Sequence, residues 1–252
     1  MVGDVPKALA ELEAAISSSE RFGLAPLRRF SRGQLPGYYF RLGRWDEAVE
    51  LADEVIADGG RHESASMIRA WMRALRGELA EAVEDAERAL AGARRSGEPQ
   101  GMYPSLAVTA FVQAETGNRE RARELLLELA DHWSQRELAY GAPADMAIAW
   151  LETLGPESWR ERYDREDTGR TAWREAVRAL VDEDYARSVA VYETTGAVTD
   201  VAAARLYAAR KLVEAGRRPE VELYLQPALS FFRSVRATRR VRQGEALLAA
   251  SA

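Results

Sequence analysis

Side chains that could perform catalysis are few and scattered in this sequence of 252 residues. Neither of its two histidines, His62 and His132, lies at metal-ligand spacing from a second ligand of the same kind. Its two lysines, Lys7 and Lys211, lack the glycine-rich context of a phosphate-binding loop. Cysteine is absent, which excludes disulfides and thiolate chemistry. The sequence therefore predicts no catalytic residue, no metal site and no cofactor, and a protein that is not an enzyme.

Charged side chains are abundant, and their spacing is typical of solvated helix faces. Runs of carboxylates such as Glu47, Glu50 and Asp53 belong to amphipathic segments. The net charge of −5 argues against nonspecific nucleic-acid binding. An arginine cluster near the C-terminal end could contact DNA or an acidic partner, but a polar cap on the last repeat is the favoured interpretation. This cluster comprises Arg233, Arg236, Arg239, Arg240 and Arg242.

A recurring turn signature organises the chain. A glycine, replaced by Glu183 in one copy, returns at intervals of 33 to 40 residues, with one interval of 66. Apolar residues on both sides recur at three- and four-residue steps, which indicates amphipathic helices. Periods of this length are typical of stacked helical hairpins. The turn positions are Gly3, Gly43, Gly77, Gly117, Glu183 and Gly216.

Small side chains lie at matching places on both sides of these turns, for example Ala48, Ala82 and Ala122 after them and Ala70, Ala110 and Ala176 before them. Such residues let two helices approach closely. The pattern resembles the tetratricopeptide repeat. The resemblance implies an all-α, right-handed superhelical solenoid of six to seven antiparallel helix hairpins. We expect one domain over residues 1–252, with units near 1–24, 28–60, 63–98, 102–138, 143–168, 169–196 and 198–235 and a capping helix at 237–250.

One unit departs from the pattern. Near Gly155 a turn is expected, but Arg160 stands where a small residue should follow, and the next segment is dense in charge. We interpret Leu154–Gly169 as a degenerate unit with a short helix and a loop. An inserted binding loop is the alternative, because insertions in repeat proteins map to loops on one face.

The first helix of each hairpin lines the concave face in such solenoids. Five residues are therefore candidates for contact with a protein or peptide partner, because buried aromatic and arginine anchors dominate many interfaces. For the aromatic members, packing between hairpins is the favoured alternative. The candidates are Phe40, Arg41, Met67, Trp71 and Phe111.

The N-terminal end lacks half a hairpin. Only two residues precede Gly3, so we expect the sequence to be a piece of a longer protein or a shortened relative of one. The apolar face of residues 7–19 would then be uncovered, which predicts homo-oligomer formation or a partner chain there. This face comprises Leu9, Leu12, Ala15 and Ile16.

The C-terminal end resembles that of large actinobacterial signalling proteins, in which an ATP-binding domain precedes tetratricopeptide-like repeats. Arg236 replaces a glycine of that pattern. The resemblance implies a regulatory repeat region of a bacterial signalling protein. The matching residues are Phe232, Val235, Ala237, Thr238, Glu245, Ala246, Leu247, Leu248 and Ala249.

We expect a cytoplasmic protein, because the absence of cysteine suits that compartment. Hydrophobic residues make up 47% and charged residues 30% of the chain, and no apolar run approaches the length of a membrane span. We expect a protein-interaction or scaffold module without membrane contact. One alternative is a small-molecule-binding or enzymatic helical protein with a pocket at 150–167, lined by Trp150, Trp159 and Tyr163. A second is a DNA-associated regulator that uses the C-terminal arginines.

Overall fold

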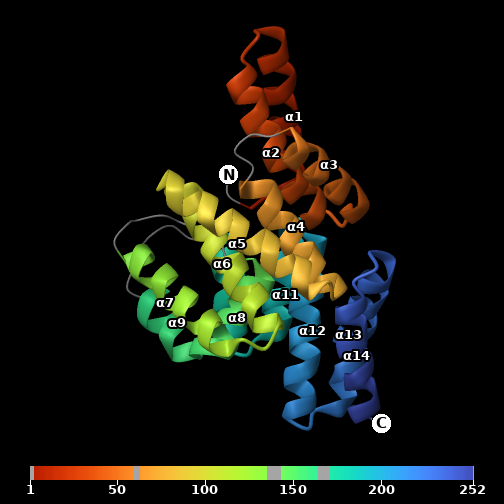
Figure 1. The fold of residues 1–252 in the computed structure, drawn as a ribbon. Coiled ribbons are helices and arrows are strands. Elements are labelled where there is room, and N and C mark those ends of the chain that lie inside the picture. The colour runs from red at the N-terminus through yellow and green to blue at the C-terminus, as the bar shows by residue number, and fades with distance from the viewer. Residues whose placement is uncertain (1–2, 59–62, 135–142, 164–170, 252) are drawn as a thin grey trace.

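The protein is an all-α solenoid of helix hairpins (Figure 1). The computed structural model describes residues 3–58, 63–134, 143–163 and 171–251, and these residues form helices without any strand. In order, the helices are α1 Val5–Arg21, α2 Ala25–Arg41, α3 Trp45–Ala57, α4 Glu63–Arg76, α5 Leu79–Ser96, α6 Pro99–Glu115, α7 Arg119–Ser134, α8 Ala144–Leu154, α9 Pro156–Tyr163, α10 Ala172–Val181, α11 Tyr185–Thr194, α12 Val198–Glu214, α13 Arg218–Ser234 and α14 Thr238–Ser251.

Each predicted turn after the first lies between two helices. The reversal needs a left-handed residue, which glycine adopts without strain. Glu183 fills this role between α10 and α11 with a φ of 59°, and Arg236 does so between α13 and α14 with a φ of 58°. The turn therefore survives at both positions where the sequence pattern loses its glycine. In the degenerate unit, Gly155 ends α8 and is followed by the short helix α9, as expected. His62 and residues 164–169 lie outside the described residues.

The hairpins stack through their first helices. Helix α2 contacts α4, α4 contacts α6, and α6 contacts α8, while each second helix packs on the first helix of its own hairpin. One continuous core runs through the stack from Val5 to Ala237. Small side chains at the helix contacts, such as Ala48, Ala82 and Ala122, are fully buried, which permits this close approach.

The C-terminal hairpins fold back on the N-terminal ones. Helix α12 contacts both α2 and α8, and α14 contacts α4 and α12. A Cβ atom on Gly43, in the turn after α2, would lie 3.0 Å from Val198 and 3.1 Å from Phe231, so this turn is pressed against α12 and α13. The inner face of the solenoid is thus covered by helices of the same chain.

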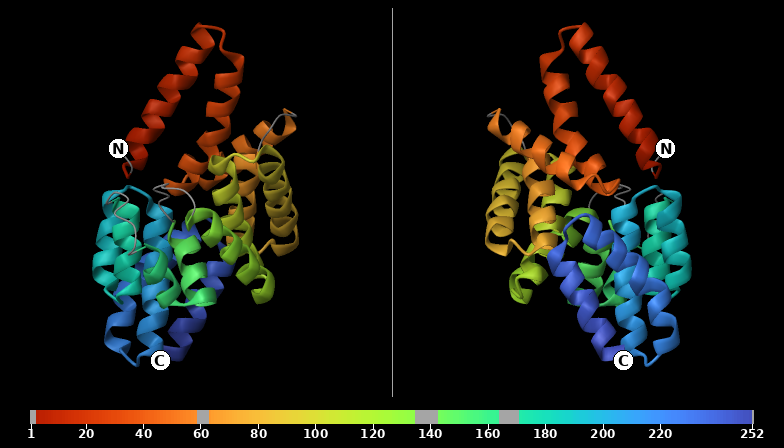
Figure 2. Two further views of the ribbon diagram at one scale, coloured as in Figure 1. Left: turned by 90° about the vertical axis from the view of Figure 1, so that its left-hand side faces the viewer. Right: turned by 90° about the vertical axis from the view of Figure 1, so that its right-hand side faces the viewer.

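Helices α1 and α2 form a hairpin that projects from the rest of the molecule (Figure 2). At its base, the N–H of Val5 donates a hydrogen bond of 2.9 Å to the carbonyl of Thr195, in the turn after α11. The prediction that the apolar face of α1 is uncovered is wrong for Leu9, which is 7% exposed. Leu12, Ala15 and Ile16 farther along the helix are half-buried.

Candidate functional site

The predicted aromatic residues form one row inside the solenoid. The ring centroids of Phe40 and Trp71 are 4.6 Å apart, and those of Trp71 and Phe111 are 6.3 Å apart. The three side chains are 0%, 2% and 2% exposed, so they belong to the core. Met67 is half-buried against the same core.

Helices from the C-terminal half cover this row and bond to it. The indole Nε1 of Trp71 donates a hydrogen bond of 3.0 Å to Oδ2 of Asp145 on α8. The guanidinium of Arg240 on α14 lies over the ring of Phe111, 5.6 Å from its centroid. The carbonyl of Phe40 accepts a hydrogen bond of 2.6 Å from the hydroxyl of Thr199 on α12. The candidate partner surface is therefore occupied by the chain itself.

Arg41, the charged candidate residue, is also held by the C-terminal half. Its Nη1 lies 3.3 Å from Oδ2 of the buried Asp200, and its guanidinium stacks 4.7 Å from the ring centroid of Trp173. The other carboxylate oxygen of Asp200 accepts a hydrogen bond of 2.7 Å from the N–H of Ala144. Burial raises the pKa of Asp200 to about 6, because the loss of hydration outweighs the stabilising charge of Arg41 and this hydrogen bond.

A second group of buried charges joins α6, α8 and α14. Nη2 of Arg240 donates a hydrogen bond of 2.8 Å to Asp145, and its Nη1 lies 3.0 Å from Oε1 of Glu115. Nε of Arg239 donates to the other oxygen of Glu115 at 2.6 Å. Burial raises the pKa of Asp145. Burial also opposes ionisation of Glu115, but the two guanidinium groups outweigh it and lower the pKa of this carboxyl.

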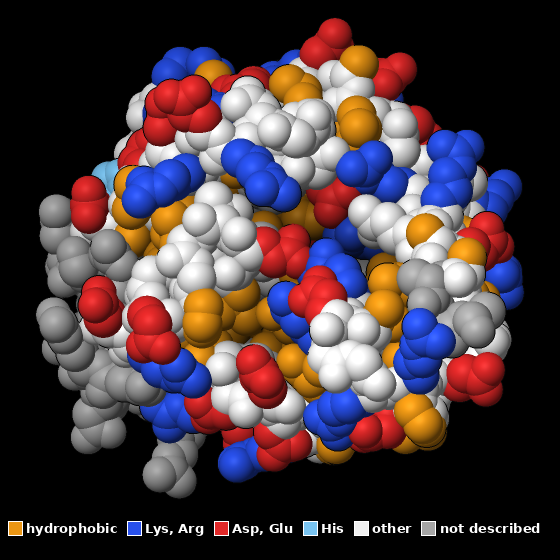
Figure 3. Space-filling model, turned by 90° about the horizontal axis from the view of Figure 1, so that it is seen from below, with side chains coloured by type: hydrophobic (Ala, Val, Ile, Leu, Met, Phe, Trp, Pro, Cys, Tyr) orange, Lys and Arg blue, Asp and Glu red, His pale blue; other side chains and the backbone are white. Residues whose placement is uncertain are grey.

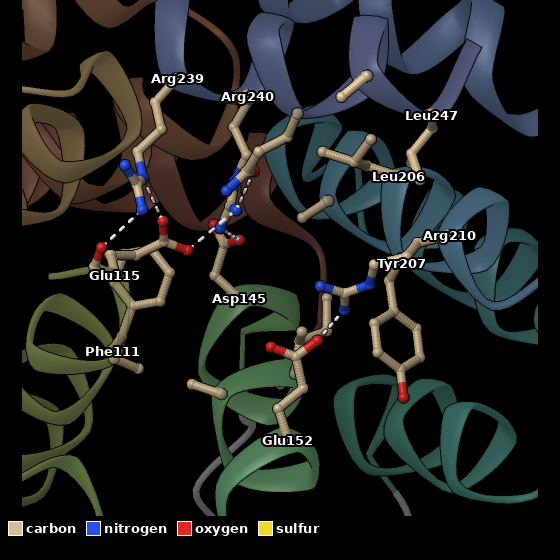
Figure 4. A pocket seen from close by; sticks show the side chains of 16 residues that line it. Phe111, Glu115, Asp145, Glu152, Leu206, Tyr207, Arg210, Arg239, Arg240 and Leu247 are labelled. Carbon is tan, nitrogen blue, oxygen red and sulfur yellow. Dashed lines mark hydrogen bonds and ion pairs between the residues drawn. The ribbon is translucent and has the colours of Figure 1, made fainter. Parts of the chain in front are cut away.

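These charges form one wall of a pocket of about 380 Å³ between α6, α8, α12 and α14. Figure 4 shows a second polar group on the facing side, where Arg210 of α12 pairs with Glu152 of α8. The guanidinium of Arg210 also lies 5.2 Å from the ring centroid of Tyr207. Burial lowers the pKa of Arg210 and raises that of Tyr207. The remaining lining is mostly apolar: Phe111, Ala114, Ile148, Ala149, Ala203, Leu206, Ala246 and Leu247, with Gln243 beside Arg240.

The pocket reaches the surface on the face that lies at the bottom of Figure 1. The space-filling view of this face shows a hollow near its middle, with hydrophobic side chains inside and both charge types around it (Figure 3). A pocket of this size, with an apolar lining and a few polar groups, has the character of a small-molecule site.

Four of the five clustered arginines pair with acidic residues of the same chain. The interpretation as a solvated cap is wrong for Arg240, which is 9% exposed and pairs with Glu115 and Asp145. Arg239 also pairs with Glu115, but its side chain remains 32% exposed. Arg236 pairs with Asp46 of α3, and Arg233 pairs with Glu245 of α14. Their charges serve to hold the C-terminal hairpins in place, and sequence reasoning missed this use of them.

The tryptophans of the degenerate unit pack against each other. The rings of Trp150 and Trp159 meet edge to face, 5.7 Å apart, and the two residues are 1% and 4% exposed. Neither lines the pocket described above, which uses Asp145, Ile148, Ala149 and Glu152 of α8. The side chain of Tyr163 and residues 164–167 lie outside the described part of the chain.

The projecting hairpin carries the main exposed apolar surface. Of the six large hydrophobic residues found exposed among the described ones, four lie at its end: Phe22 at 66%, Leu24 at 49%, Leu27 at 46% and Phe30 at 57%. We call these four residues the hairpin tip. The other two, Val198 and Leu223, lie on separate helices, α12 and α13. A cluster of this kind on a folded surface marks a contact site more often than a scattered apolar residue does.

The described residues meet neither the requirements of a metal site nor those of a membrane-spanning helix. Among the described residues, no group of histidine and carboxylate side chains is arranged to hold a metal ion. His132 accepts a hydrogen bond of 3.2 Å at its backbone carbonyl from the hydroxyl of Tyr103. No described helix has the length and apolar character needed to cross a membrane.

Comparison with known proteins adds no family to this description, since no family model matches the sequence and no curated protein matches it. The fold and its contacts define the chain as an all-α helical-repeat protein. Its inner face is filled by its own C-terminal helices, and it retains a central pocket and a projecting hairpin.

Proposed function

We propose that this protein is a non-enzymatic interaction module that binds another protein through the hairpin tip, and that its first partner is a second copy of itself. The observation that carries the proposal is the concentration of exposed apolar side chains on one projecting hairpin. The packed solenoid behind it would act as a rigid scaffold in the cytoplasm.

The charges of the hairpin support a second copy as the occupant. Along α1, Glu11 and Glu13 are exposed, and α2 carries the exposed Arg29. Arg28 and Arg32 of α2 lie 3.8 Å from Glu20 and 3.3 Å from Glu54 of the same chain. A two-fold pairing of hairpins places α1 of one copy beside α2 of the other, because an isologous contact joins the same patch on both subunits. This arrangement brings opposite charges together around Leu27 and Phe30.

Sedimentation velocity over a range of protein concentrations tests the proposal. We expect the wild type to form a dimer, and we expect the Leu27→Ser/Phe30→Ser variant to dimerise at least about tenfold more weakly, since apolar side chains at the centre of an interface dominate its stability. Leu223→Ser is the matched control, because Leu223 is 72% exposed on α13, away from the hairpin.

Two results would overturn this proposal. One is a wild type that remains monomeric up to its solubility limit. The other is a dimer that the hairpin variant leaves intact while Leu223→Ser weakens it. Circular dichroism establishes that the variants are folded.

We infer further that the module is a tetratricopeptide-like repeat region of bacterial signalling type, or derived from one. The turn register and the C-terminal residues from Phe232 to Ala249 support this inference. A regulatory role would consist of holding or releasing a catalytic domain according to the state of the module. The DNA-associated alternative loses support, because most of the arginine cluster is paired with carboxylates of this chain.

A further inference from the structure

The central pocket combines a surplus of hydrogen-bond donors with an apolar lining. Three guanidinium groups face three carboxyl groups in it, and each guanidinium carries five N–H donors. Both oxygens of Asp145 are already used by Trp71 and Arg240, and both side-chain oxygens of Glu115 are used by Arg239 and Arg240. The N–H groups of the three guanidinium groups therefore favour a ligand that supplies acceptors.

Arg240 leaves one donor without a partner. It is 9% exposed, and its Nε is buried with no hydrogen-bond acceptor among the described residues. An unsatisfied buried donor of a charged group is costly and is expected to have a use. Arg240 also lies over the ring of Phe111, which places a cationic edge next to an apolar wall.

Arg210 is the cationic side chain of the pocket that could exchange its present carboxylate partner, Glu152, for a ligand. Its ion pair with Glu152 is partly open to solvent, with the side chains 37% and 41% exposed. Burial is the main cause that lowers the pKa of Arg210, and the positive charge of Arg240 acts in the same direction. An anion placed between Arg210 and Arg240 would relieve this repulsion, and Glu152 would be free to turn toward water (Figure 4).

We propose that the pocket binds a small organic acid, with its carboxylate held by Arg210 on the side that faces Arg240 and its apolar body against the alanine and leucine side chains of α12 and α14. Guanidinium groups bind carboxylates in a planar, often bidentate geometry, which makes this ligand class a good match. The volume of about 380 Å³ accommodates an aliphatic or aromatic body of this kind.

Ligand-observed NMR titration tests this site with phenylbutyrate and hexanoate as probes. The matched probes are phenylbutanamide, which lacks the charge, phenylbutylamine, which reverses it, and inorganic phosphate, which lacks the apolar body. We expect saturable binding of at least one of the two acids, and the other three probes to bind at least about tenfold more weakly, the magnitude of a charge-assisted contact.

Two variants locate the site. Arg210→Gln removes the cation, and its expected affinity for the acid is about tenfold to hundredfold weaker. Arg205→Gln is the matched control on the same helix, because Arg205 pairs with Glu193 and does not line the pocket. Ala246→Trp fills the mouth from a solvent-exposed position and is expected to abolish binding without disturbing the core.

Absence of saturable binding for both acids would overturn the proposal. Equal affinity for the acid and its amide would also overturn it, as would full binding by a folded Ala246→Trp variant. If Arg210→Gln fails to fold, the Ala246→Trp result decides alone. The result of this binding experiment does not depend on whether the protein dimerises through the hairpin tip, since the dimer measurement uses different residues and a different readout.

Discussion

Arg41 of α2 and Asp200 of α12 form an ion pair of 3.3 Å, although 159 positions separate them in the sequence. Asp200 is buried, and Arg41 stacks on Trp173 on its other side. The pair ties α2, near the start of the chain, to α12, near its end. It belongs to a series of contacts through which the C-terminal helices cover the inner face of the solenoid, apart from the central pocket.

This pair predicts a pH dependence of stability. Folding raises the pKa of Asp200 to about 6, so the folded state binds a proton at this carboxyl more tightly than the unfolded state does. Protonated Asp200 therefore contributes stability that is complete below about pH 4 and is lost as the pH rises through 6. Relative to Asp200→Asn, which does not titrate, the free energy of unfolding of the wild type should fall by about 3 kcal/mol between pH 4 and pH 7. Urea unfolding of both proteins over this range measures the difference. A difference that stays constant or grows with pH would contradict the assignment.

The buried arginine on α14 should matter far more than an exposed one nearby. Arg240→Met removes the cationic partner of Asp145 and leaves Glu115 paired with Arg239 alone, and we expect a loss of about 3–5 kcal/mol. Arg233→Met breaks a pair whose side chains are 52% and 51% exposed, and its expected cost is below about 1 kcal/mol. Chemical denaturation compares the two, and equal costs would show that the Arg240 network is solvated.

Alanine substitutions at two turn glycines distinguish the cost of backbone strain from the cost of crowding by neighbouring side chains. Gly43 and Gly216 both have positive φ, at 78° and 71°, so alanine at either position costs about 1 kcal/mol in strain. Only Gly43 has neighbours at 3.0 and 3.1 Å, whereas a Cβ on Gly216 meets nothing within 4 Å among the described residues. We expect Gly43→Ala to be less stable than Gly216→Ala by about 1–3 kcal/mol in thermal unfolding. Similar values would mean that α12 and α13 do not press on the turn after α2.

Sequence reasoning predicted the local structure well, because local structure depends on local signals. Glycine spacing and apolar periodicity located the hairpins, and the register even identified Glu183 as the residue that replaces a turn glycine. The short helix of the degenerate unit followed from the loss of small residues near Arg160.

Contacts between helices that are distant in the sequence could not be predicted from these local signals. Whether Arg41 meets solvent, a partner or Asp200 depends on how tightly the solenoid curves, and small rotations at every helix contact determine this curvature. The same limit applies to Arg240, which sequence reasoning placed on a solvated cap. Buried arginines and exposed ones have the same local pattern, and only the position of their acidic partners distinguishes them.

Closure of the solenoid by its own C-terminal helices is the central claim of this account, and a cross-link tests it most directly. A Cβ on Gly77, in the turn after α4, would lie 3.7 Å from Cβ of Arg239 on α14, which is the separation found in disulfides. The natural sequence has no cysteine, so Gly77→Cys/Arg239→Cys introduces the only pair of thiols. We predict that mild oxidation forms an intramolecular disulfide while the helical circular dichroism is retained. A folded double variant that stays reduced, or that links only between molecules, would contradict the closed arrangement.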